Sequence, residues 1–203
     1  MFARLLHNLI ARLRDDEGGS IAVEAILMFP VLAWCYMATY IWFDAYRTQT
    51  TVLKSAYTVS DMLSRETQPI TNTYLDSVWK VQKMLAHAGR NPKMRITEIE
   101  RNYNDNTSDP NDSRVFNVVW SQTRGGAPVL TDTRLKELRD QIPTMPPGEK
   151  AILVETWSPY EPIMSVGLNA MVFQNFIITR PRFASQLCWS SKNSNWSPSD
   201  LTC

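Results

Sequence analysis

The longest apolar run in the chain extends from Ile21 to Phe43, and Glu24 is its only Asp, Glu, Lys or Arg. An α-helix over these 23 residues rises about 34 Å, enough to cross a hydrocarbon core of roughly 30 Å. A carboxylate near the end of a span costs under about 3 kcal/mol, less than the surrounding apolar side chains contribute. The pattern therefore predicts a transmembrane helix over residues 20–43.

The same helix is expected to continue as a stalk over residues 44–68, because an apolar stripe follows the span. Its members recur at spacings of four, three and four residues: Val52, Ala56, Val59 and Leu63. Other positions are largely polar, so one face of this segment can pack on a soluble domain. The helix is predicted to end near Gln68 and Pro69.

Two shorter helices are predicted in the remaining residues, 69–203. The first runs from Thr73 to Ala88, with Thr73 and Asp76 as a capping box. Its expected inner stripe is Tyr74, Val78, Val81 and Leu85. The second runs from Thr131 to Ile142 and is expected to be capped by Asp132. Its inward residues are Leu135, Leu138 and Ile142.

Four strand patterns cover residues 94–103, 114–124, 150–157 and 172–179. The third is expected to stop at Ser158-Pro159, because proline cannot donate to a ladder. Residues 104–112, rich in Asn and Asp, are interpreted as a solvated hairpin loop; a calcium loop of the EF-hand type needs a different spacing and a glycine. The elements predict an α+β fold, in which a long N-terminal transmembrane and stalk helix carries a head of about four mostly antiparallel strands and two short helices.

Composition narrows the range of partners. The chain has 203 residues, 21 basic and 20 acidic, and a mean hydropathy of −0.26 despite the apolar run. This length leaves room for one polar domain besides the span, and the charge balance does not favour nucleic acid.

Arg4, Arg12 and Arg14 precede the span, so the positive-inside rule predicts a cytoplasmic N-terminus and an extracytoplasmic head. A cleaved secretory signal peptide is disfavoured, because the run is too long and ends in bulky Trp42-Phe43.

The three cysteines fall into two groups. Cys35 lies in the span and is interpreted as an inert apolar residue. Cys188 and Cys203 lie 15 positions apart and would pair in an oxidising compartment. Closing a loop of this length with a disulfide stabilises the folded state by about 3 kcal/mol on the chain-entropy model. Two free thiols are the alternative. The tail from Trp189 is expected to be loose without this disulfide.

Enzyme chemistry finds little support in the sequence. The two histidines, His7 and His87, have no nucleophile motif beside them, and no phosphate loop or Cys/His metal spacing occurs. We therefore predict no enzyme, no cofactor and no metal site. Glu155 and Glu161 could form a carboxylate pair, but they are interpreted as charged ends of a surface strand.

Glu24 has two interpretations: an idle carboxylate at a membrane edge, or a functional acid. Gly19 lies five positions upstream in a Gly-Gly pair that a protease can approach in an extended form. A cut after Gly19 would leave the whole span on the product. Ser20 would become the new N-terminus, with Glu24 one helical turn away at i+4.

These residues carry a resemblance to a known family. Gly19-Ser20-Ile21-Ala22-Val23-Glu24, followed by Ala25-Ile26-Leu27-Met28-Phe29-Pro30-Val31-Leu32, resembles the N-terminus of TadE-like proteins, the pseudopilins of tight-adherence (Tad, Flp) pilus systems. Trp157-Ser158-Pro159-Tyr160 and Arg180-Pro181-Arg182-Phe183 are similar to the end of the TadE/TadF branch. The middle of the chain matches only in length and general plan.

The resemblance implies cleavage by a prepilin peptidase between Gly19 and Ser20, with residues 1–19 as the leader. Glu24 would then be the fifth residue of the mature chain and would register the subunit against a neighbour's free amino terminus. The implied partners are other pilins and pseudopilins and the Tad assembly platform in the bacterial inner membrane. Ala25 stands where the major Flp pilins have Tyr, which favours a minor subunit.

Two rival classes remain open at the level of sequence. One is an uncleaved single-pass membrane protein whose outer domain binds a ligand or polymer through its aromatic residues. The other is a hydrolase with an exported domain, which would need a pocket that joins His87 to a nucleophile.

Overall fold

The computed structural model describes residues 18–86, 92–102 and 115–203. The chain divides into two compact units. One contains the chain as far as Ala45 together with Pro162–Asn169, and the other contains Tyr46–Glu161 and Ala170–Cys203. We call the second unit the head.

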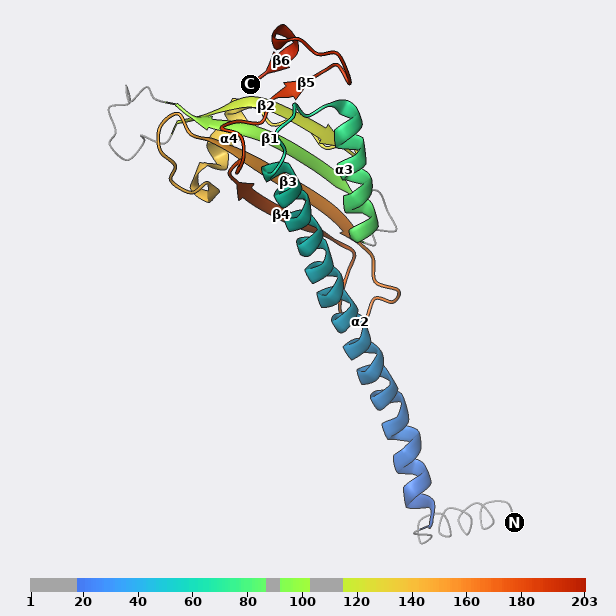
Figure 1. Cartoon of the computed structure of the whole chain (residues 1–203). Helices are drawn as coiled ribbons and strands as arrows, with labels where there is room; N and C mark the ends of the chain where they lie inside the picture. The colour runs from blue at the N-terminus through green and yellow to red at the C-terminus, as the bar shows by residue number, and fades with distance from the viewer. Residues whose placement is uncertain (1–17, 87–91, 103–114) are drawn as a thin grey trace, which may run out of the picture. The chain divides into compact units, whose positions relative to one another are not determined.

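A single helix, α2, extends from Gly18 to Ser64 over 47 residues and contributes to both units (Figure 1). It is long and apolar enough to cross a membrane, and no residue in its most apolar stretch is buried. The predicted long N-terminal helix is thus confirmed, while its insertion in a membrane stays a prediction. The helix ends at Ser64, a little before the predicted Gln68, and the Ser64 carbonyl accepts a hydrogen bond from the Arg182 N–H group instead of from a further helical turn.

The head is built on a four-stranded antiparallel sheet in the order β2-β1-β3-β4. Its strands are β1 (Lys93–Arg101), β2 (Phe116–Arg124), β3 (Lys150–Tyr160) and β4 (Met171–Thr179). All four predicted strands are therefore confirmed, as is the α+β class.

The third strand was predicted too short, because β3 continues through Pro159 to Tyr160. Its pairing with β1 reaches only as far as Trp157, whereas its pairing with β4 extends to Tyr160. Pro159 therefore lies on a locally open edge of β3, where a missing N–H group breaks no ladder hydrogen bond on the β1 side.

The helix caps differ from those predicted. Helix α3 covers Asn72–Leu85, and its N-cap is Thr71, whose side chain accepts a hydrogen bond from the Tyr74 N–H group. Thr73 thus lies inside the helix, so the predicted capping box is wrong. The buried stripe is Leu75, Val78 and Gln82, with Tyr74, Val81 and Leu85 half-buried beside it.

The second short helix is also shorter than predicted. Helix α4 covers Asp132–Glu137, and a 3₁₀ turn, η1, follows over Arg139–Gln141. Asp132 does not cap the helix; its carboxylate accepts a hydrogen bond of 2.7 Å from the Val118 N–H group of β2. The side chain therefore ties α4 to an edge strand of the sheet.

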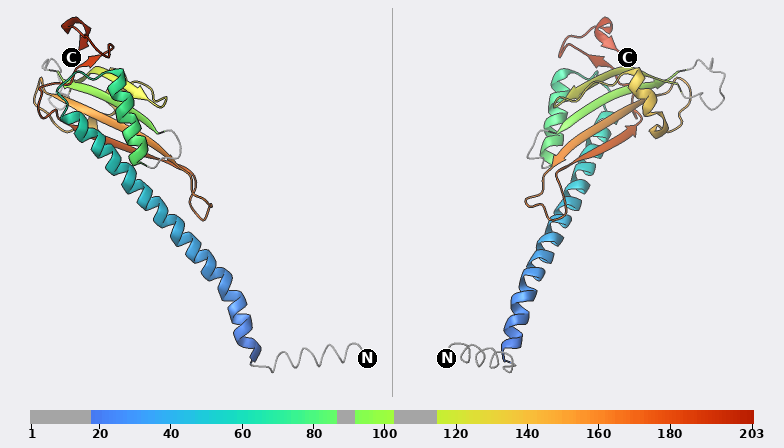
Figure 2. Two further views of the ribbon diagram at one scale, coloured as in Figure 1. Left: turned by 45° about the vertical axis from the view of Figure 1, so that its right-hand side comes forward. Right: turned by 180° about the vertical axis from the view of Figure 1, so that it is seen from behind.

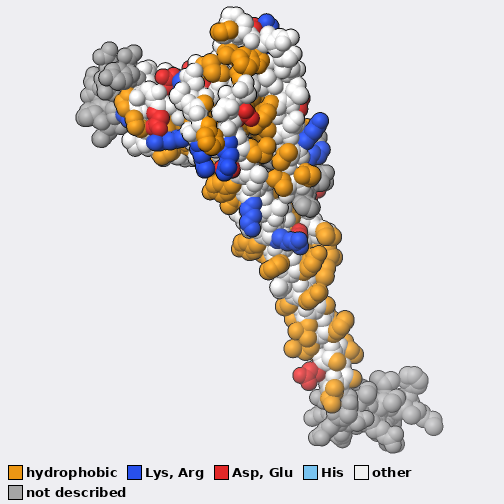
Figure 3. All heavy atoms as spheres, in the orientation of Figure 1, with side chains coloured by type: hydrophobic (Ala, Val, Ile, Leu, Met, Phe, Trp, Pro, Cys, Tyr) orange, Lys and Arg blue, Asp and Glu red, His pale blue; other side chains and the backbone are white. Residues whose placement is uncertain are grey.

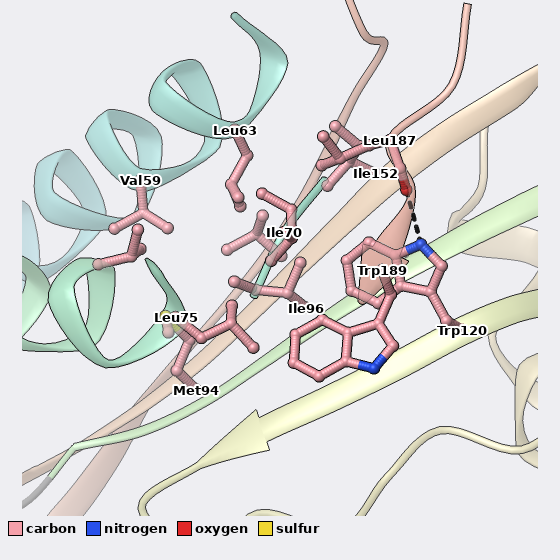
Figure 4. Packing of buried hydrophobic residues seen from close by; sticks show 12 residues of the cluster. Val59, Leu63, Ile70, Leu75, Met94, Ile96, Trp120, Ile152, Leu187 and Trp189 are labelled. Atoms are coloured by element: carbon pink, nitrogen blue, oxygen red, sulfur yellow. Dashed lines mark hydrogen bonds between the residues drawn. The ribbon is translucent and has the colours of Figure 1, made fainter. Parts of the chain in front are cut away.

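Apolar clusters cover both faces of the sheet. Helix α3 and the second half of α2 lie on one face and α4 on the other (Figure 2). The first cluster joins Val59 and Leu63 of α2 to sheet residues such as Ile96, Ile152 and Val154 (Figure 4). The predicted stripe of α2 is confirmed, because each member is 0–1% exposed: Val52, Ala56, Val59 and Leu63.

The C-terminal tail is held to this first cluster. A disulfide joins Cys188 and Cys203, as predicted, and encloses the two-stranded ribbon of β5 (Trp189–Ser190) and β6 (Leu201–Thr202). Ile70 pairs with Trp189 in a parallel bridge, accepts a hydrogen bond from the Ser190 N–H group and donates one to the Cys188 carbonyl. The tail is thus fixed by backbone pairing as well as by the disulfide.

Candidate functional site

The candidate site occupies the first turns of α2. Gly19 and Ser20 are already helical, and Glu24 follows one turn later with an exposed side chain. An extended approach of a protease to the Gly19–Ser20 bond therefore requires the first turn to unwind. Glycine is the poorest helix former after proline, so the Gly18-Gly19 pair lowers the cost of this unwinding.

The surface around Glu24 is apolar and uncovered. Large hydrophobic side chains occupy most of the following turns, and their exposure is high: Ile21 75%, Ile26 71%, Leu27 66% and Phe29 75%. Figure 3 shows hydrophobic side chains along this part of α2. A helix that is apolar all round is suited to a lipid or helix-bundle environment rather than to water.

Glu24 has no counter-charge in the described part of the chain. Salt bridges there join other groups, and none of them involves Glu24. An ionised carboxylate in a dry environment is strongly disfavoured unless a cation and hydrogen-bond donors approach it. If this segment is surrounded by lipid or other helices, the cation must come from outside the described residues.

Exposed aromatic side chains gather where the apolar run ends. Tyr36, Tyr40, Phe43 and Tyr46 are 55–74% exposed, and Trp42 is 44% exposed. Trp and Tyr concentrate at membrane–water interfaces, because one part of each ring system is apolar and another part forms hydrogen bonds. The aromatic girdle, as we call these five residues, is thus suited to one boundary of a bilayer.

Glu155 is not a surface charge, so the interpretation of Glu155 and Glu161 as ends of a surface strand is wrong for Glu155. It is buried and forms a bidentate pair with Arg95, with Nε–Oε2 at 2.5 Å and Nη2–Oε1 at 2.7 Å. Arg95 also donates to the Pro128 carbonyl and stacks on Trp157. Because each nitrogen of Arg95 and both oxygens of Glu155 form hydrogen bonds inside the protein, the pair is suited to structure rather than catalysis. Glu161 is exposed.

A second buried acid, Glu98, was not singled out by the sequence reasoning. Its carboxylate accepts hydrogen bonds from the Leu187 N–H group at 2.7 Å and from Trp120 Nε1 at 3.1 Å. Burial raises the pKa of Glu98, although the Leu187 hydrogen bond and the nearby Lys150 oppose this shift. The sequence contained a sign of this burial, because Glu98 alternates with Met94 and Ile96 on the apolar face of β1.

Other candidate residues are not brought into a site. His87, the leader arginines and the Asn- and Asp-rich segment 104–112 lie outside the described residues. Within the described ranges, no three His, Cys, Asp or Glu side chains come close enough to hold a metal ion. Cys35 is an exposed free cysteine on α2.

We found no match to this chain among protein-family models, curated proteins or solved structures.

Proposed function

We propose that this chain is a minor pseudopilin that supports assembly of an adhesive Tad (Flp) pilus, after a prepilin peptidase cuts between Gly19 and Ser20. The observation that carries the proposal is the division of α2. Its first half is uncovered and apolar with one carboxylate, whereas its second half supplies buried residues to an α+β head. Such a helix can insert in a membrane or a helical bundle at one end while it anchors a folded domain at the other.

Glu24 is proposed to register the subunit in the assembly. After cleavage, the Ser20 amine of a neighbouring subunit supplies the missing cation. Each charge alone is costly in a dry bundle, but a well-placed pair with further hydrogen bonds is tolerated. The pairing therefore favours one axial register between neighbouring helices over others.

The proposed location is the bacterial inner membrane, with the N-terminus in the cytoplasm and the head in the periplasm. The disulfide between Cys188 and Cys203 supports export, because such bonds persist in oxidising compartments. The proposed partners are other pilins and pseudopilins and the inner-membrane assembly platform. On this proposal, the protein is a substrate of the peptidase and not itself an enzyme.

Cleavage is tested by intact-mass measurement of the full chain from bacterial membranes, with and without a coexpressed prepilin peptidase. The expected product with the peptidase begins at Ser20, and the chain without it retains residues 1–19. Gly19→Val should block the cut, because its side chain obstructs the close approach to the backbone that glycine allows. A chain that keeps Met1 beside an active peptidase would overturn the proposal and favour an uncleaved single-pass protein with a ligand-binding outer domain.

A further inference from the structure

The loop between β3 and β4, Pro162–Asn169, carries an unusual apolar tip. It contains no Asp, Glu, Lys or Arg. Ile163 at its start is 82% exposed, the highest value among the large hydrophobic side chains in the described residues, and Met164 is 49% exposed. A solvated hairpin loop would be expected to carry polar residues at such positions.

The tip has a defined backbone geometry. The Val166 N–H group donates to the Met164 carbonyl at 3.1 Å, which closes a tight turn. Gly167 follows with a φ of +74°, a conformation that residues with a Cβ rarely adopt. These features hold Ile163 and Met164 at the outer end of the loop, while Leu168 behind them is buried.

This loop belongs to the compact unit formed with α2 as far as Ala45, and not to the head. Both views of Figure 2 draw it beside α2. Burial on α2 in this unit follows one face at intervals of four: Met37 is half-buried, and Ile41 and Ala45 are buried. The loop therefore lies at the level of residues 37–45 of the helix.

That level coincides with the aromatic girdle. Tyr40, Trp42 and Phe43 are exposed beside Ile41, and the first basic residue after the span, Arg47, follows Tyr46. Aromatic side chains followed by a cation mark the headgroup region at the end of a membrane helix. A loop tip at this level would meet the interface between lipid and water.

We propose that the β3–β4 loop is a second membrane contact, with Ile163 and Met164 inserted among the lipids of the outer-facing leaflet beside α2. This inference rests on the proposed membrane insertion of α2. The partner is the apolar part of the lipid rather than an anionic headgroup, because the loop has no Lys or Arg. One helix alone can rotate about its axis, whereas a contact on one side of it fixes that rotation.

The depth of the loop is tested with the full chain in phosphatidylcholine vesicles. Cys35 is replaced by Ala so that the Cys188–Cys203 disulfide remains and one new cysteine can carry a fluorophore. The label is placed in turn by Ile163→Cys, by Phe43→Cys as the span control, and by Val129→Cys as the control for an exposed apolar residue of the head. Quenching is measured with lipids brominated on the upper part of one acyl chain.

We expect quenching of the labels at positions 163 and 43 to exceed that at 129 at least threefold. Quenching at 43 with none at 163 would overturn the loop contact and leave the membrane span intact. Absence of quenching at both 43 and 163 would overturn the span and with it the proposed function. Because Ile163, Phe43 and Val129 are exposed, these substitutions leave the core unchanged, which intact disulfide formation verifies.

Discussion

Two carboxylates, Glu24 and Glu98, both lie among apolar side chains, but Glu24 is exposed and Glu98 is buried. Glu98 is fully buried and receives hydrogen bonds from Leu187 and Trp120 within its own chain. Glu24 is exposed on an apolar helix, and the described residues offer it no cation. The first acid serves the fold, and the second is the one that we propose pairs with another chain.

Removing the charge of Glu24 should therefore affect assembly and not folding. On the proposed function, we expect Glu24→Ala and Glu24→Gln to lower co-isolation with other pilus subunits at least about 100-fold, because breaking a buried ion pair costs about 3–5 kcal/mol. Thermal unfolding of the head should be unchanged. Met28→Ala, also on the exposed apolar part of α2, is the matched control and should assemble normally. Assembly of Glu24→Ala at the wild-type level would remove the proposed role.

Glu98 makes the stability of the head depend on pH. Its pKa in the folded state lies above the ordinary value of 4.5, so the folded state binds the proton more tightly than the unfolded state does. The contribution of this group to stability is therefore lost as pH rises from about 4.5 through the folded pKa.

The variant Glu98→Gln should remove this dependence. The difference between the free energy of unfolding of the variant and that of the wild type should increase in favour of the variant as pH rises from acid to neutral. Urea unfolding at several pH values measures this difference. An opposite trend, in which the wild type gains on the variant with rising pH, would show that the hydrogen bonds from Leu187 and Trp120 outweigh burial.

At the scale of elements, α2 combines two environments in one continuous helix. Leu63, in its last turn, is fully buried in the head, whereas Leu27, in the first half, is 66% exposed. Truncation of a buried leucine loses transfer free energy and leaves a cavity in the core. Truncation of an exposed leucine outside the head leaves the core of the head unchanged.

We expect Leu63→Ala to lower the free energy of unfolding of the head by about 2–5 kcal/mol. Leu27→Ala is the same chemical change, and it should leave the free energy of unfolding of the head within about 0.5 kcal/mol of the wild-type value. Both are measured by denaturant unfolding of the full chain in detergent micelles, followed by tryptophan fluorescence. Equal effects would mean that the stripe of α2 does not stabilise the head.

Periodicity in the sequence was sufficient to predict α2, its buried stripe and the four strands, because each depends on a pattern within one segment. Thr71 rather than Thr73 caps α3, and β3 runs through Pro159, because these details depend on neighbouring elements. The buried partners of Arg95 and Glu98 were missed for a related reason. They come from β3 and from the tail, and the order of strands in the sheet is not contained in any one pattern.

At the scale of the whole molecule, the bridge at Ile70 joins the segment between α2 and α3 to the C-terminal tail, and the disulfide closes that tail into a loop. Leu187 and Trp189 belong to the same apolar cluster as Val59 and Leu63. Because Cys188 adjoins both tail residues, the bond restrains a part of the core as well as the tail itself.

Cys203→Ser should therefore lower the free energy of unfolding by about 3 kcal/mol on the chain-entropy model. Reduction of the wild type should have the same effect, whereas Cys35→Ser should have none. The measurement is thermal unfolding followed by tryptophan fluorescence, to which Trp120 and Trp189, with ring centroids 6.1 Å apart, contribute. If Cys203→Ser unfolds at the wild-type temperature, the backbone pairing of Ile70 alone is sufficient to hold the tail.

The position of Leu187 and Trp189 in the core also sets an order of events in time. A ribosome makes these residues after every strand of the sheet, so the cluster around Ile96 and Ile152 stays incomplete until they have been synthesised. For an exported chain, the head can therefore close only after residues 187–189 have crossed the membrane. An assembly machine that engages folded heads would thereby exclude subunits still in transit.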